Sequence, residues 1–166
     1  RPVEKVNWTE AVAFCNLLTN QEQAAGRLPA GWAYVLPTES QWEYACRAGT
    51  TTAYSWGSTI TSSNANWNHG ADPNQTVDVG QFSANPWGFF DMHGNVWEWT
   101  ADWYQAAYPT GNPVADPSGP ASGSNRVYRG GSWGNVGAAL RSAKRSNSPP
   151  SYRHSNFGFR VGFQKQ

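Results

Sequence analysis

The residues best suited to chemistry lie in the segment Asn85–Tyr104, which reads NPWGFFDMHGNVWEWTADWY. It holds four of the ten Trp residues, two Gly and the three carboxylates Asp91, Glu98 and Asp102. Neither an amphipathic helix nor an alternating strand explains this mixture. We therefore expect a rigid, irregular core segment, in which the rings are buried and the carboxylates satisfy buried polar groups or a cation.

Other arrangements that would support catalysis are weaker. The histidines His69, His93 and His154 lack the spacing of metal ligands. His93 stands two residues after Asp91, which could suit acid–base chemistry, although a histidine in such a turn-forming segment is more often structural. Ser132 lies in a GGSW motif that is not a nucleophile elbow and that precedes no predicted helix, as a phosphate-binding loop would.

The two cysteines, Cys15 and Cys46, fall within apolar helical patterns. This placement favours buried free thiols in a reducing, cytoplasmic compartment, with a disulfide between the two helices as the alternative. A metal site built on both would need His or acidic neighbours, and none is nearby in the sequence.

Length and charge give a broad outline of the molecule. A length of 166 residues predicts one domain. The sequence shows no signal peptide and no long apolar run, so no membrane span is predicted. Residues 1–116 hold 4 Lys/Arg and 11 Asp/Glu, whereas residues 117–166 hold 8 Lys/Arg and no acid. This imbalance favours C-terminal arginines that fold back onto N-terminal carboxylates, and the alternative is a basic face for an anionic partner.

Local signals predict two helices and several short strands. The pairs Asn7/Glu10 and Thr38/Gln41 form capping boxes, and apolar spacing then predicts helices over 8–23 and 39–48. Strands are expected at 34–36, 77–79, 126–133, 140–146 and 157–163. The segment 96–103 is expected to be a strand or a short helix, and 50–85 and 108–125 to be loops. The chain is therefore predicted to be α+β.

Several motifs in order resemble one family. They are LPTESQWEYACRAG, the segment Asn85–Tyr104, RVYRGGSW and NFGFRV. Together they resemble the sulfatase-modifying-factor family, whose fold is the formylglycine-generating-enzyme type of C-type lectin fold. The resemblance implies one loop-rich α+β domain over residues 1–166, with two helices packed on short antiparallel strands. The family's usual N-terminal strand portion has no counterpart here, so we expect a processed or trimmed chain.

The same resemblance implies a chemistry that this chain lacks the residues to perform. Enzymes of the family oxidise a sulfatase cysteine to formylglycine with copper held by two cysteines, which correspond here to Asn135 and Leu140. Neither residue supplies the thiolate that soft Cu(I) selects, so we expect no copper and no formylglycine synthesis. In secreted relatives, the two helix cysteines pair with cysteines that correspond to Ala143 and Val161. Without those partners, the free-thiol interpretation is strengthened.

A calcium site is also implied by the resemblance. The side chains of Asp91 and Glu98 and the carbonyls of Gly94 and Val96 would be its ligands. Hard oxygen ligands in one tight turn suit Ca²⁺. In the alternative, Asp91 accepts hydrogen bonds from turn amides and Glu98 pairs with an arginine such as Arg129.

The C-terminal part resembles a second group of proteins with this fold. In WGNVGAALRSAKRSNSPPSYRHSNF, which spans 133–157, framework residues such as Arg141, Ser142 and Arg145 alternate with small and polar ones. This is similar to the variable region of diversity-generating-retroelement proteins, in which mutagenic reverse transcription replaces residues of a ligand-binding face. Within residues 126–160, the exchangeable positions would be Gly134, Asn135, Val136, Ala139, Lys144, Ser146, Asn147, Ser148, Tyr152, His154 and Ser155.

These resemblances predict a non-catalytic binding module of bacterial or viral origin, with a protein or other macromolecule as its ligand. Nucleic acid is not the expected ligand, because the framework arginines of this fold are expected to lie in ion pairs. The alternative is a sulfatase-modifying-type oxidoreductase, or an inactive paralogue of one.

Overall fold

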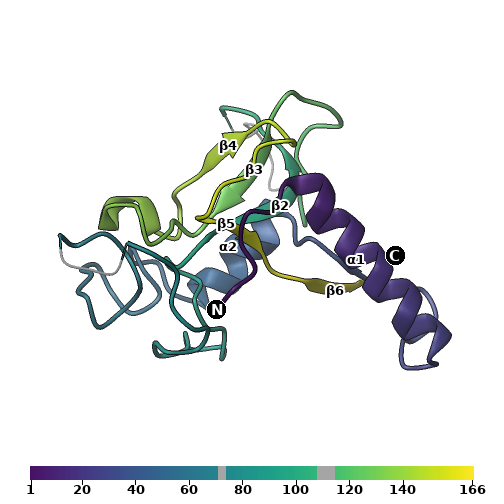
Figure 1. Cartoon of the computed structure of the whole chain (residues 1–166), viewed down its shortest axis with the longest axis horizontal. Coiled ribbons are helices and arrows are strands. Elements are labelled where there is room, and N and C mark those ends of the chain that lie inside the picture. Colours follow the sequence, from purple (N-terminus) through teal and green to yellow (C-terminus); the bar gives the residue numbers. More distant parts are fainter. Residues whose placement is uncertain (71–73, 108–114) are drawn as a thin grey trace.

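Two helices and two small sheets form most of the regular structure (Figure 1). The computed structural model describes residues 1–70, 74–107 and 115–166. The elements, in chain order, are α1 (Trp8–Ala24), β1 (Trp32–Val35), α2 (Glu39–Arg47), β2 (Trp97–Trp103), β3 (Arg126–Arg129), the 3₁₀ helix η1 (Gly137–Leu140), β4 (Ser146–Ser148), β5 (Phe157–Phe159) and β6 (Gly162–Lys165).

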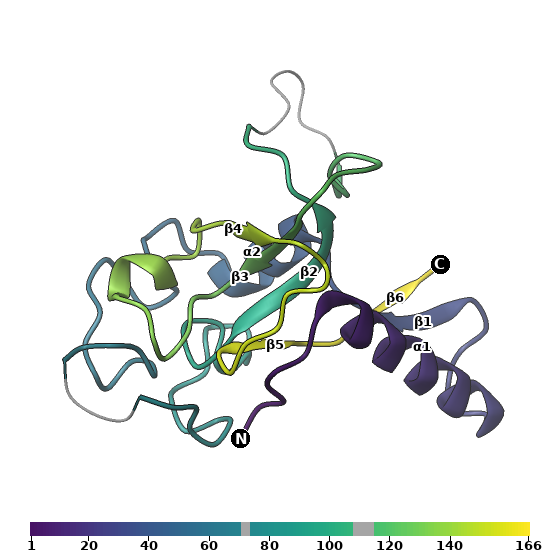
Figure 2. The same cartoon turned by 45° about the horizontal axis from the view of Figure 1, so that its top comes forward.

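The larger sheet has the strand order β4-β3-β2-β5 (Figure 2). Its β3 pairs antiparallel with both β2 and β4, whereas β5 runs parallel to β2. The smaller sheet pairs β1 with β6 antiparallel, so that the last strand closes onto the first. The structure is therefore the predicted loop-rich α+β fold, although the larger sheet is mixed rather than wholly antiparallel.

Both helices begin where their capping boxes predict. The Asn7 side chain accepts from the Glu10 amide, and the Glu10 carboxylate accepts from the Asn7 amide, each at 2.9 Å. Thr38 and Gln41 make the equivalent pair at the start of α2. These bonds satisfy amides that have no partner within the helix.

Three strand predictions are wrong for reasons that lie outside the local sequence. Residues 77–79 form no strand, because Val77 bonds through its main chain to the side chain of Asn95. The predicted strand 140–146 is replaced by η1 and β4, since Leu140 is drawn fully into the core. The predicted strand 157–163 divides into β5 and β6 around Arg160, whose side chain turns to Glu98.

The remaining predictions for irregular and ambiguous segments are partly resolved. The segment 96–103 is a strand, β2. Of the predicted loop 108–125, residues 108–114 lie outside the described residues, and 115–125 contain no helix or strand.

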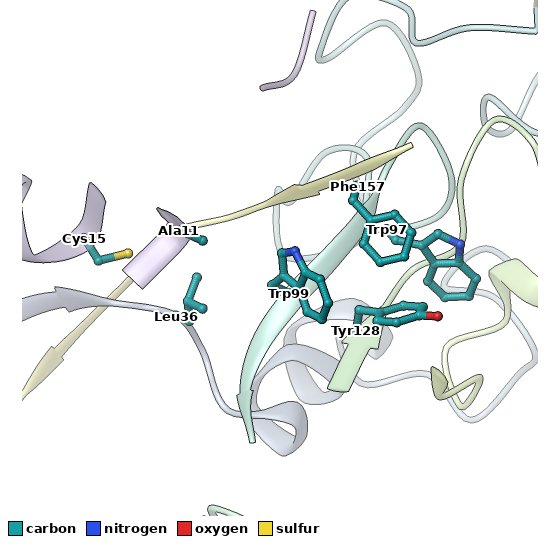
Figure 3. Close-up of a cluster of buried hydrophobic side chains, with 7 residues drawn as sticks. All are labelled: Ala11, Cys15, Leu36, Trp97, Trp99, Tyr128 and Phe157. Atoms are coloured by element: carbon teal, nitrogen blue, oxygen red, sulfur yellow. The ribbon is translucent and has the colours of Figure 1, made fainter. Parts of the chain in front are cut away.

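The main core is built from a few large rings. Trp99 is fully buried and packs against the rings of Tyr128 and Phe157, with centroids 5.4 and 5.3 Å away (Figure 3). Aromatic contacts of this kind add to the free energy gained from burial alone. The complete cluster joins α1 and β1 to the larger sheet and consists of Ala11, Cys15, Leu36, Trp97, Trp99, Tyr128 and Phe157.

A buried ion-pair network joins α2 to the C-terminal third. Arg129 is fully buried and contacts the carboxylates of Glu39 and Glu43, and it also donates to the Ser142 carbonyl at 2.7 Å. Arg145 pairs with the same Glu39, with an Nη2–Oε2 distance of 2.7 Å. The predicted folding of C-terminal arginines onto N-terminal carboxylates is thus confirmed.

Replacement of Arg129 by Leu should destabilise the fold by about 3–5 kcal/mol, because it removes the buried guanidinium that Glu39 and Glu43 share and leaves them only the more exposed Arg145 and Arg47. Urea denaturation measures this loss. The matched control is Arg153→Gln, which breaks an ion pair with Glu10 whose side chains are 55% and 44% exposed. That control should cost no more than about 1 kcal/mol. Equal effects of the two changes would contradict a structural role for the buried network.

Candidate functional site

The four predicted calcium ligands are brought together by the structure. Asp91, Gly94, Val96 and Glu98 all line one cavity of about 490 Å³, beside the start of β2. Asp91 accepts from the Gly80 amide at 2.7 Å, and its burial raises the pKa of its carboxyl group.

The negative charge of Glu98 is already balanced by the guanidinium of Arg160. Its carboxylate accepts from Arg160 at 2.7 Å and from the Trp42 indole at 2.6 Å. Glu98 therefore pairs with an arginine, as the alternative to calcium predicted, but the partner is Arg160 and not Arg129. A calcium ion that used Glu98 would lie beside a guanidinium, so Glu98 as placed does not fit the predicted ligand set.

A glycine is required in this turn. Gly94 has φ +87°, and a Cβ there would lie 2.3 Å from the Asn66 carbonyl oxygen. Its amide donates to the Gly130 carbonyl at 2.8 Å. The turn therefore lies directly against both the 50–85 loop and the end of β3, and a side chain at position 94 would separate them.

The described parts of the long loop 50–85 are held by two asparagine side chains, those of Asn66 and Asn95. Asn95 Oδ1 accepts from the Val77 amide at 3.0 Å and from Asn66 Nδ2 at 3.2 Å. Asn66 also donates to the Gln75 carbonyl at 3.0 Å. Asn66 and Asn95 are both buried. The sequence gives no signal for this contact, because the residues involved are far apart in the chain.

His93 is a structural histidine with a defined tautomer. Its Nδ1 lies 2.7 Å from the Leu140 carbonyl, and its Nε2 accepts from the Ser55 amide at 3.2 Å. Burial lowers the pKa of His93 to about 4. Burial also raises the pKa of Cys46, which lies 3.5 Å from Nε2, to about 12. The pair is therefore a neutral thiol and a neutral imidazole rather than a nucleophile and its base.

His93 should make stability fall as the pH falls. Its folded-state pKa of about 4 lies below the ordinary 6.5, so the unfolded state binds more protons between these values. Relative to His93→Gln, the wild type should lose about 2–3 kcal/mol between pH 6.5 and pH 4 in urea denaturation. Asp102, with its pKa raised to about 6, acts in the opposite sense but is common to both proteins. Parallel pH profiles would contradict this assignment.

The eleven predicted exchangeable residues share one property: none of them is buried. Between them lie the buried residues Gly137, Leu140 and Ser142, and the buried Phe157 follows them. Other framework residues are more exposed, namely Arg141, Ala143 and Arg153. Over much of this segment, exchangeable residues at the surface thus alternate with buried framework residues. The exposed framework positions do not follow this pattern.

Main-chain hydrogen bonds fix the path of residues 134–155. The Ser142 amide donates to the Ala53 carbonyl at 2.8 Å, and the Asn68 amide donates to the Asn135 carbonyl at 2.9 Å. Further along, the Lys5 amide donates to the His154 carbonyl. Strand β4 is held by its pairing with β3. Such bonds do not depend on side-chain identity, so substitutions can leave the backbone unchanged.

The two residues predicted to replace copper-binding cysteines, Asn135 and Leu140, have different environments. Asn135 is half-buried and accepts from the Ser132 hydroxyl at 2.6 Å. Leu140 is fully buried against Tyr54 and Ala65. The cysteines of the chain are elsewhere, in α1 and α2, and both are buried free thiols as predicted.

None of the described helices has the length and apolar character needed to cross a bilayer.

Comparisons with known proteins agree with this fold. A family profile for the sulfatase-modifying factor enzyme 1-like domain matches residues 1–164. Formylglycine-generating enzymes of Mus musculus and Streptomyces coelicolor are each 34% identical over 96% of the chain. The matches cover 43% and 51% of those relatives, so the chain spans about half of their length.

A solved structure gives a second comparison. Treponema denticola variable protein 1 superposes with a TM-score of 0.85 at 32% identity, covering 100% of this chain and 72% of that one. Together with the profile and the curated relatives, this likeness establishes that the chain belongs to the sulfatase-modifying factor enzyme 1-like family.

Proposed function

We propose that this chain is a non-catalytic ligand-binding module on a formylglycine-generating-enzyme-type scaffold. Its recognition face is formed by the eleven partly or fully exposed residues between 134 and 155. These residues vary through a diversity-generating retroelement, and the ligand is a protein or another macromolecule. Calcium, copper and catalysis are not needed for this role.

One observation carries the proposal: main-chain bonds and buried framework residues hold the backbone of 134–155. Some exchangeable side chains, such as Ser146 and Asn147, also bond to Tyr128 and Asn125. Main-chain bonds to Ala53, Asn68 and Lys5 hold the segment, and Leu140 and Ser142 anchor it in the interior. Binding sites are commonly carried on such loops over a rigid scaffold. A rigid loop also loses little conformational entropy on binding.

The likeness to Treponema denticola variable protein 1 supports the same role. It extends over the whole of this chain, including the segment that carries the eleven positions. That protein is called a variable protein, and we propose that the eleven positions of this chain vary likewise.

The alternative function is that of an oxidoreductase like the formylglycine-generating relatives, or of an inactive paralogue. The residues at the two copper positions disfavour the oxidoreductase, because an amide and an alkyl side chain replace the thiolates that Cu(I) prefers. A paralogue without activity would share the fold and lack only the variable face.

An activity assay separates binding from catalysis. Purified protein incubated with copper and a cysteine-containing sulfatase peptide should consume no oxygen and leave the peptide thiol intact. A formylglycine-generating enzyme assayed in parallel provides the positive control. Any turnover by this chain above the copper-only blank would overturn the non-catalytic assignment.

Calcium binding by Asp91, Gly94, Val96 and Glu98 stays a prediction. The shared cavity supports it, and the ion pair of Glu98 with Arg160 opposes it. Bound calcium would stabilise only the folded state, so a chelator should lower the Tm of the wild type and leave the Tm of Asp91→Ala unchanged. If the chelator leaves the wild-type Tm unchanged, no calcium ion contributes to this site.

A further inference from the structure

The basic residues of the C-terminal third are not all used in ion pairs. Arg129, Arg145, Arg153 and Arg160 pair with carboxylates. Arg126 lies between the Trp8 and Trp103 rings, at 3.7 and 3.4 Å from their centroids. Over the described ranges, no carboxylate pairs with the three remaining cations, which are Arg141, Lys144 and Lys165.

Two of these cations, Arg141 and Lys144, line a cavity that a third cation also lines. Arg141 and Lys144 line a cavity of about 330 Å³ together with Arg47, at the C-terminal end of α2. The rest of the lining is Thr51, Thr52, Ala53 and Ala143, so no acidic residue contributes to it. Three positive charges around one small cavity repel one another and attract an anion.

A nearby carboxylate offsets only part of this charge. Glu43 accepts from Arg47 Nε at 2.8 Å, but it is also shared with the fully buried Arg129. Arg47 further donates to the Thr52 carbonyl at 3.3 Å. The cavity therefore keeps a net positive charge from Arg141 and Lys144, neither of which is buried.

The cavity walls are held in place by the backbone. The loop after α2 runs beside the segment that follows η1 (Figure 1), and the Ser142 amide donates to the Ala53 carbonyl across this contact. Arg141 Nε donates to the Ala138 carbonyl at 3.0 Å, which orients its guanidinium group. The Lys144 amide donates to the Arg141 carbonyl at 2.9 Å. The Arg141 guanidinium and the backbone that carries Lys144 are thus positioned before any ligand arrives.

We propose that this cavity binds a phosphate-type oxyanion, either free or carried as a phosphate group on the ligand. A guanidinium fork can donate two parallel hydrogen bonds to such a group, while a lysine adds a point charge. Lys144 belongs to the proposed recognition face. The idea that the bound phosphate group is part of the module's ligand therefore rests on the proposed function. The cation cavity itself is defined by the structure alone.

Calorimetric titration of the intact chain with inorganic phosphate and with O-phosphoserine tests the proposal. Affinity should fall about tenfold in Lys144→Gln and further in Arg141→Gln/Lys144→Gln. It should also weaken as salt is raised from about 0.02 to about 0.15 M. Lys165→Gln is the matched control, because it removes one exposed, unpaired cation outside the cavity and should keep wild-type affinity.

The outcomes distinguish a phosphate group carried on a ligand from a free oxyanion, and they test the anion site separately from the proposed function. Tighter binding of O-phosphoserine than of inorganic phosphate would indicate a carried phosphate group, and the reverse order would indicate a free oxyanion. Absence of binding to the wild type, or equal binding by the wild type and the double variant, would overturn the anion site. Neither result bears on catalysis, so failure here is distinct from turnover in the sulfatase-peptide assay.

Discussion

The burial of Arg129 is the constraint on which the rest of the structure depends. A buried guanidinium is costly unless carboxylates and hydrogen-bond acceptors surround it. Glu39 and Glu43 supply the charge, and the Ser142 carbonyl supplies a further acceptor. These contacts fix α2 against β3 and place residue 142, from which the segments on either side extend. The proposed recognition face therefore takes its position partly from the contacts of Arg129.

A second ion pair, between Glu98 and Arg160, lies directly beside the first and acts in the same way. Glu98 in β2 lies opposite Arg129 in β3, yet its carboxylate bonds to Arg160 and Trp42. This contact brings the chain after β5 back to the Asp91–Glu98 turn. The segment that first suggested an active site is thus a structural centre, where Gly94, Asn95 and His93 hold neighbouring loops.

The sequence predicted what depends on neighbouring residues and missed what depends on distant ones. Capping boxes are local, so both helices were predicted within one residue at each end. The strand predicted at 140–146 failed because the burial of Leu140 is decided by Tyr54 and Ala65. The charge imbalance predicted that C-terminal arginines pair with N-terminal carboxylates, but it did not identify Arg160 as the partner of Glu98. The cavity beside Arg141 and Lys144 also required the fold, since Arg47 lies far from them in the sequence.

The central claim is that a fixed framework carries an exchangeable surface, and the DNA encoding residues 126–160 tests it most directly. The account predicts a near-repeat of this DNA beside a reverse transcriptase gene. The two copies should differ at codons for exposed positions such as Lys144, Tyr152 and His154, and should agree at codons for buried Arg129, Leu140 and Ser142. The absence of a repeat, or differences concentrated at the buried positions, would contradict the account.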